Sequence, residues 1–145
     1  MEQGTATARL EDDPDDRFVR LRAALGVTSF GLNQIVLRPG QRGRIHRHEH
    51  QEEVYVVLDG TLTLFVEGEE TTLGRGDVVR VGPDVRRQLV NRGPGVLSLL
   101  AIGGAGGHEG RDGLAYPTWD AAESDAVSPR DLPLPEDLPE AERRG

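Results

Sequence analysis

Short apolar runs fill residues 27–102, and turn residues separate each run from the next. The runs occupy residues 34–37, 54–58, 62–66, 78–81 and 96–102. Apolar runs of strand length with turn signals between them are typical of β-sandwiches and barrels, whereas a parallel sheet would need helical crossovers that this stretch lacks. The pattern therefore predicts an all-β region.

Glycine-containing pairs mark the turns of this region. The pair Asp59-Gly60 stands between two apolar runs, and such a pair accepts the positive φ angles of a two-residue type I′ turn. The sequence therefore predicts a β-hairpin at Asp59-Gly60. Further turns are predicted at Glu67-Gly68 and at residues 74–76.

A short helix is predicted before the first strand. The acidic residues at 15–16 are suitable N-caps, and Phe18, Leu21 and Leu25 would share one apolar face. Gly26 accepts the left-handed conformation that commonly ends a helix. We expect this helix to pack on the outside of the domain.

The formal net charge of -8 comes from the two ends of the chain. Residues 1–16 hold six acidic residues and one Arg, and residues 121–145 hold seven acidic residues and three Arg. Acidic, polar ends with few aromatic residues are typical of solvated tails. We expect a flexible leader at residues 1–16, one domain at residues 17–120 and a Pro-rich, disordered tail at residues 121–145. The near-neutral domain gives no sign of a nucleic-acid partner.

The absence of two residue types excludes several chemistries. The chain has no Cys, which excludes disulfides, thiolate metal sites and a Cys nucleophile. It has no Lys, which excludes a Schiff base and a P-loop lysine. It also has no apolar run of about 18 residues. We therefore expect a cytoplasmic protein without a membrane partner.

Three of the four histidines stand at alternate positions, His46, His48 and His50, and the acids Glu52 and Glu53 follow them. Successive side chains of a strand point to opposite faces, so alternate spacing places the imidazoles on one side of a sheet. Imidazole and carboxylate together form a metal-ligand set. The window therefore predicts a functional site.

The histidine window belongs to a longer pattern of spaced residues: Gly40, His46, His48, Glu53 and Gly60. This pattern resembles the first conserved motif of the cupin superfamily. A second pattern resembles the second cupin motif and contains Gly76, Pro83 and Asn91. Both lie largely within residues 34–102. The resemblance implies a double-stranded β-helix, or jelly-roll barrel, with a divalent metal ion held by His46, His48 and Glu53.

The family's fourth metal ligand is a His that precedes the Asn of the second motif by four residues, and this chain has Arg87 there. A guanidinium stays protonated and has no lone pair to offer a cation. Two functions therefore remain open. In the first, a divalent ion such as Fe, Mn, Zn or Ni binds at the three remaining ligands, and the protein is a metal-dependent enzyme whose reaction the sequence leaves unassigned.

In the second function no metal binds, because Arg87 takes the place of the ion and pairs with Glu53. The protein is then a binding or sensor module for a small anionic ligand. Arg87, with Arg44 or Arg80, would hold a carboxylate or phosphate through its forked donors.

The remaining polar and aromatic residues are expected to have structural roles. His50 is expected in the turn after the ligand strand, and Glu52 on the outer face of the next strand. The segment 103–119, which includes His108, is either a lid or an exit segment, and Trp119 is expected to anchor it. Uncovered sheet edges favour a homodimer.

Overall fold

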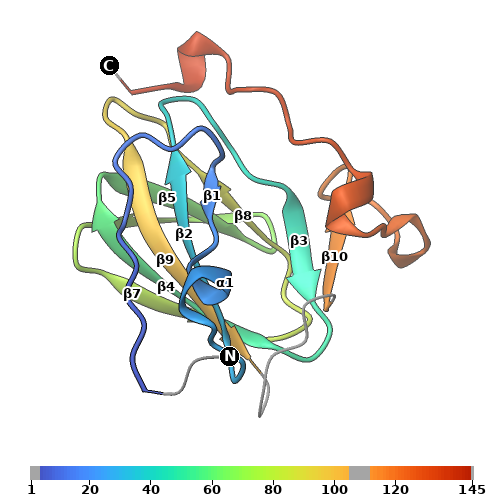
Figure 1. Ribbon diagram of the computed structural model, residues 1–145. Coiled ribbons are helices and arrows are strands. Elements are labelled where there is room, and N and C mark those ends of the chain that lie inside the picture. Colours follow the sequence, from blue (N-terminus) through green and yellow to red (C-terminus); the bar gives the residue numbers. More distant parts are fainter. Residues whose placement is uncertain (1–3, 105–111, 145) are drawn as a thin grey trace.

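The computed structural model describes residues 4–104 and 112–144. Within these residues two antiparallel, five-stranded sheets face each other in a jelly-roll (Figure 1). The strand order is β1-β2-β9-β4-β7 in the first sheet and β10-β3-β8-β5-β6 in the second. The predicted all-β jelly-roll is confirmed.

The first sheet consists of β1 (Phe18–Val19), β2 (Gly31–Leu37), β9 (Leu97–Gly104), β4 (Glu52–Asp59) and β7 (Val78–Val81). The second consists of β10 (Gly113–Tyr116), β3 (Ile45–His48), β8 (Arg87–Val90), β5 (Thr61–Val66) and β6 (Glu69–Gly74). The described helical segments are α1 (Leu21–Leu25), η1 (Glu123–Asp125), η2 (Pro129–Asp131) and η3 (Glu140–Glu142). None of them has the length and apolar character needed to cross a membrane.

The core lies between the sheets and follows from the two-residue period of the strands. Alternate residues of the apolar runs point inward and are buried: Ile35, Leu37, Tyr55, Val57, Leu62, Leu64, Leu97 and Leu99. Each buried aliphatic side chain contributes roughly 1.5–3 kcal/mol to stability. A shift of one residue in any of these strands would turn its apolar set outward, so the apolar pattern also fixes the register.

The hairpin predicted at Asp59-Gly60 is wrong, because β4 and β5 belong to different sheets. Strand β4 pairs with β7 and β9, whereas β5 pairs with β6 and β8. The turn therefore carries the chain from one sheet to the other. Gly60 does have a positive φ of 81°, and a Cβ there would lie 2.4 Å from the carbonyl oxygen of Val96. Glycine is needed at this position for a close backbone approach.

The two-residue hairpin lies one turn later, at Glu67-Gly68. These residues have φ angles of 50° and 82°, and they join the paired strands β5 and β6. Positive φ at both central residues is the signature of a type I′ turn, whose twist suits a hairpin.

The N-terminal helix is shorter than the sequence predicts. Phe18 and Val19 form β1, which pairs with Ile35 and Gln34 of β2. Sheet pairing satisfies the backbone groups of these residues and thereby outweighs a weak helical pattern. The end of the helix is as expected, because Gly26 has a φ of 72° and caps α1.

The N-terminal leader makes specific contacts with the barrel. The side-chain amide of buried Gln34 donates to the carbonyl oxygen of Glu11 and accepts from its N–H, both at 2.9 Å. This pairing differs from the flexible leader that composition predicts. The contact uses the backbone of Glu11, so the acidic side chain that signals a solvated tail gives no sign of it.

The C-terminal segment also lies against the barrel, although composition predicts a disordered tail. Residues 128–138, which we call the C-terminal strap, run from beside β10 past the start of β3 (Figure 1). Arg42 and Arg44 donate to strap carbonyl oxygens at 2.8 and 2.7 Å. Leu138 is buried, and its N–H donates to the carbonyl oxygen of Gly40 at 2.7 Å. The barrel thus holds the strap mainly by its backbone groups.

A pair of glycine substitutions tests the turn assignment. We expect Gly60→Ala to lower the free energy of unfolding by about 3 kcal/mol, the sum of a left-handed backbone penalty and a steric clash. Gly68→Ala is the matched control, since its φ is similar but no atom lies within 4 Å of the added Cβ. It should cost only about 1–2 kcal/mol. Equal losses in urea unfolding would contradict the close approach at Gly60.

Candidate metal centre

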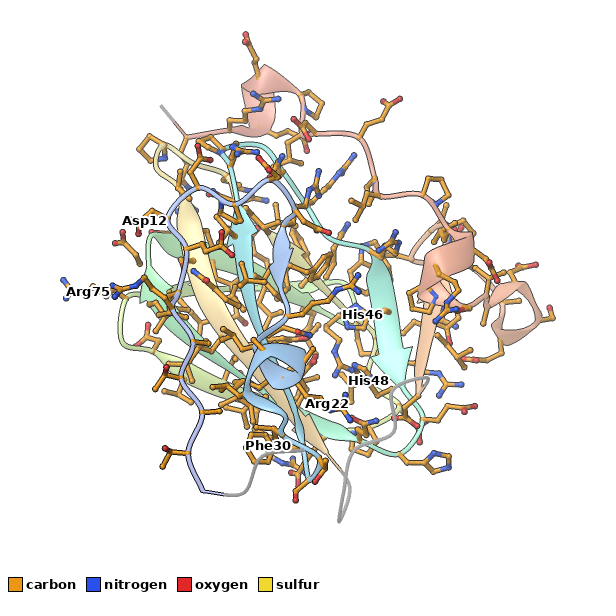
Figure 2. The ribbon with its side chains drawn as sticks, in the orientation of Figure 1. Asp12, Arg22, Phe30, His46, His48 and Arg75 are labelled. Carbon is orange, nitrogen blue, oxygen red and sulfur yellow. The ribbon has the colours of Figure 1, made fainter. Side chains whose placement is uncertain are left out.

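His46 and His48 point from β3 toward the first sheet, into a cavity of about 290 Å³ (Figure 2). Polar side chains lining the cavity include Arg17, Asn33, Arg44, His46, His48 and Glu53. The apolar lining includes Phe18, Ile35, Leu37, Leu89 and Leu134. The cavity thus joins an apolar wall to a small set of charged groups, as ligand sites commonly do.

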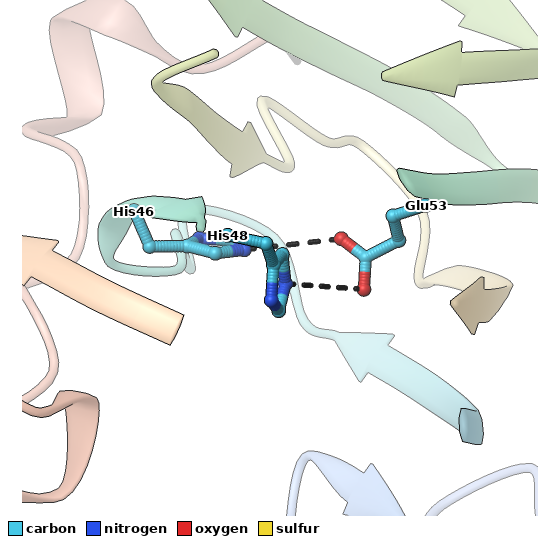
Figure 3. Close-up of side chains that lie close together, drawn as sticks. All are labelled: His46, His48 and Glu53. Carbon is cyan, nitrogen blue, oxygen red and sulfur yellow. Dashed lines mark ion pairs between the residues drawn. The ribbon is translucent and has the colours of Figure 1, made fainter. Parts of the chain in front are cut away.

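The two imidazoles face the carboxylate of Glu53, which reaches the cavity from β4 (Figure 3). His46 Nε2 lies 3.9 Å from Glu53 Oε1, and His48 Nε2 lies 3.7 Å from Glu53 Oε2. Two ligand atoms that each lie about 2.1 Å from one ion can be at most about 4.2 Å apart. One ligand atom from each of the three residues lies within 4.8 Å of the others. Both His–Glu53 distances lie within the limit of about 4.2 Å, and the three residues are therefore candidate ligands of one metal ion.

A backbone carbonyl orients the ring of His46. Its Nδ1 lies 3.1 Å from the carbonyl oxygen of Arg44. A carbonyl oxygen only accepts, so this contact is a hydrogen bond when Nδ1 carries the proton. Nε2 then has the lone pair and presents it to the cavity, which is the tautomer that a metal ligand needs.

Asp112 stands behind His48 and fixes the turn between β3 and β4. Its buried carboxylate accepts from the N–H groups of His50 and Gln51 at 3.0 and 2.8 Å. Burial raises the pKa of this carboxyl, but these hydrogen bonds outweigh burial and lower it. Among the described residues, His48 Nδ1 is buried without a hydrogen-bond partner and lies 3.7 Å from Asp112 Oδ2. Asp112 is a residue of the site that the sequence did not indicate.

The carboxylate of Glu53 divides its two oxygens between different partners. Oε1 accepts from the hydroxyl of Tyr55 and from Nη2 of Arg87, the latter at 3.3 Å. Oε2 faces His48. Burial would raise the pKa of the Glu53 carboxyl, but His46 and then His48 hold it well below its ordinary value. The group is therefore an anion in the folded protein at neutral pH.

Arg87 lies beside the centre, although it does not line the cavity. It is the pairing partner of His46 across β8 and β3, and its side chain is fully buried. Nη1 donates to the carbonyl oxygen of Val85 at 2.7 Å, and Nε donates to the Tyr55 hydroxyl at 3.3 Å. The sequence leaves two uses open for Arg87, a pair with Glu53 and a contact with a ligand anion, and in the structure the guanidinium contacts Glu53 and Tyr55.

The other candidate residues are separated from one another. Arg44 lines the cavity. Arg80 is exposed and pairs with Glu52 at 2.5 Å on the outer face, so the three predicted arginines are not brought together. The imidazole of His50 is also exposed and contacts Asp112 instead of Glu53. Alternation along β4 explains why Glu53 points inward and Glu52 outward.

The segment after β9 was predicted to form a lid or an exit segment. His108 lies outside the described residues. The ring of Trp119 lies 6.4 Å from that of Phe65, and the hydroxyl of Tyr116 accepts from Nε of Arg47 at 2.8 Å. Neither aromatic residue lines the cavity. Within the described part of the chain, these two residues have structural roles.

Comparison with known proteins connects this site to a family. Residues 33–103 match the cupin domain family. The tetracenomycin polyketide synthase protein TcmJ of Streptomyces glaucescens is 32% identical over 71 residues, which cover 49% of this chain and 48% of TcmJ. The chain spans about half the length of the curated relatives it matches.

Two solved structures share the arrangement of the strands. A cupin protein from Bacteroides fragilis is 26% identical, with a TM-score of 0.64, over 84% of this chain and 98% of the other. A sugar phosphate isomerase of the cupin superfamily from Silicibacter pomeroyi is 27% identical, with a TM-score of 0.61, over 76% and 73% of the two chains. Because the matched residues contain most strands of the two sheets and the inward-facing histidines, the chain belongs to the cupin superfamily.

Proposed function

We propose that the protein binds a divalent metal ion through His46, His48 and Glu53 and uses it to hold a small molecule in the barrel. The observation that carries this proposal is the convergence of two imidazole nitrogens and one carboxylate oxygen on the cavity wall. The family supports the proposal, because the three residues occupy the positions of the metal ligands in the first cupin motif.

The donor set suits a catalytic or binding ion. Two His and one carboxylate leave coordination positions open for water or a small molecule, an arrangement used by iron and compatible with manganese, zinc and nickel. A bound ion of this kind supplies a Lewis acid that polarises an oxygen of the small molecule. Arg44, through its carbonyl oxygen, and Asp112 support the two His rings from behind.

Arg87 is compatible with this use of the site. Its guanidinium and the Tyr55 hydroxyl both contact Oε1 of Glu53, which leaves Oε2 and the two Nε2 atoms for an ion. In this proposal Arg87 positions the metal-binding carboxylate and does not replace the metal.

The lining of the cavity bears on the kind of molecule that binds. A volume of about 290 Å³ is small for a ligand site and fits a molecule of about one ring. The names of the relatives suggest either polyketide chemistry or sugar phosphates. The apolar side chains of Phe18, Ile35 and Leu89 favour a molecule with an apolar body. The cytoplasmic location and the homodimer stay predictions.

Metal content tests the proposal directly. We expect wild-type protein expressed with added Fe, Mn, Zn or Ni to carry close to one ion per chain by elemental analysis. The double variant His46→Ala/His48→Ala should lose it, because one carboxylate cannot retain the ion. His50→Ala is the matched control, since its ring belongs to the same window but lies in a separate candidate group with Glu49 and Asp112. An empty wild type would contradict the proposal, and so would loss of the ion in the His50 variant.

A second test concerns Arg87. We expect Arg87→Met to lower the free energy of unfolding by about 3–5 kcal/mol, because it leaves Glu53 buried without its cation. Arg80→Met is the control, and because its pair with Glu52 is exposed it should cost at most about 1 kcal/mol. Metal content should not rise in Arg87→Met. If wild-type protein contains no metal and Arg87→Met does, Arg87 takes the place of the ion in the wild type.

A further inference from the structure

Two arginines come together at one end of the cavity, away from the buried Arg87. Arg44 immediately precedes β3 and stands two residues before His46, so both side chains lie on the inner side of the strand. Arg17 immediately precedes β1 and lines the same cavity. Its Nη1 donates to the carbonyl oxygen of Arg42 at 3.0 Å, which holds the start of β1 against the start of β3.

The charges of these two arginines are poorly compensated by the protein. Nε of Arg44 donates to the carbonyl oxygen of Leu132 in the strap at 2.7 Å. Among residues 4–104 and 112–144, no carboxylate lies within 4.0 Å of Arg44, and its two terminal nitrogens have no hydrogen-bond partner. Among the same residues, Arg17 has one carboxylate within 4.0 Å, that of Asp137, and this carboxylate is half exposed.

We infer that Arg44 and Arg17 bind an oxyanion carried by the small molecule that occupies the cavity. Two adjacent guanidiniums with only one distant, half-exposed carboxylate between them attract an anion, and their forked donors match the oxygens of a carboxylate or a phosphate. The ligand is thus a small molecule with an apolar body and one anionic group. The anion site itself depends only on the two arginines and the cavity.

The position of Arg44 relative to the histidines sets the size of this ligand. Two residues along a strand span about 6.6 Å, so Arg44 and His46 are separated by roughly the length of one ring and its substituent. A single-ring acid therefore reaches from the arginines to the three metal ligands. This second contact rests on the proposed function.

Calorimetric titration of metal-free protein with three probes tests the anion site. Benzoate and phenyl phosphate carry the two oxyanions, and benzyl alcohol is a neutral molecule of similar size. We expect both anions to bind wild type at least tenfold more tightly than benzyl alcohol does, since hydrogen bonds to charged groups are the stronger ones. The lower dissociation constant of the two anions identifies the preferred group.

Variants assign the binding to the two arginines. Arg44→Gln should weaken the preferred anion about tenfold or more, and Arg17→Gln about threefold or more. Arg80→Gln is the control and should leave affinity unchanged, because Arg80 lies on the outer face. Since Arg44 also holds the strap, Arg17→Gln on a separate element keeps the test valid if Arg44→Gln unfolds. Equal binding of benzyl alcohol, or full affinity in both cavity variants, would overturn the inference.

The measurements distinguish a failure of the proposed anion site from a failure of the proposed metal centre. We expect Arg44→Gln and Arg17→Gln to keep the metal content of wild type. If wild type lacks metal but the arginine substitutions still abolish benzoate or phenyl phosphate binding, the proposed metal function fails and the anion site stands. If wild type carries the ion but neither arginine affects anion affinity, the anion site fails alone.

Discussion

The site depends on one partly buried anion, the carboxylate of Glu53. A carboxylate removed from water is costly unless donors and positive charges surround it. Tyr55 and Arg87 contact one of its oxygens, and the imidazoles of His46 and His48 face the pair. Arg87 therefore has a clear physical task, although it occupies the position where the family has a fourth metal ligand. The substitution exchanges a metal contact for a fixed carboxylate.

The three proposed ligands come from opposite layers of the barrel. His46 and His48 lie on β3 of the second sheet, and Glu53 lies on β4 of the first. An ion bound to all three would connect the two sheets directly. Because a group that binds only the folded state stabilises it, metal binding at this position would stabilise the packing of the sheets as well as provide chemistry.

The sequence placed several cavity-lining residues on one face. Alternation set Glu53 and Glu52 on opposite faces, and the distance from Glu53 to Gly60 selected Glu53. Alternation could also have indicated Tyr55, which stands two residues after Glu53 on the same face. Asp112 and Arg17 were not predictable, since both reach the site across distant parts of the chain. Asp112 follows a glycine-rich stretch, whose sequence has no apolar pattern from which the register of the next strand could be predicted.

Turn signals and composition had similar limits. Asp59-Gly60 and Glu67-Gly68 look alike locally, yet only the second joins paired strands, because the choice depends on which sheet receives the next strand. The acidic composition of the two ends reports only on the polarity of their side chains. The barrel binds their backbone groups, which every sequence possesses.

The residues that line the cavity extend beyond the part of the chain that matches the cupin domain. Arg17, Phe18, Pro129 and Leu134 line it, yet all four lie outside residues 33–103. Two proteins can therefore share the whole cupin domain and its histidines while differing in part of the wall that a ligand touches. Ligand choice in such barrels can therefore change through segments outside the matched domain while the proposed metal-binding face is retained.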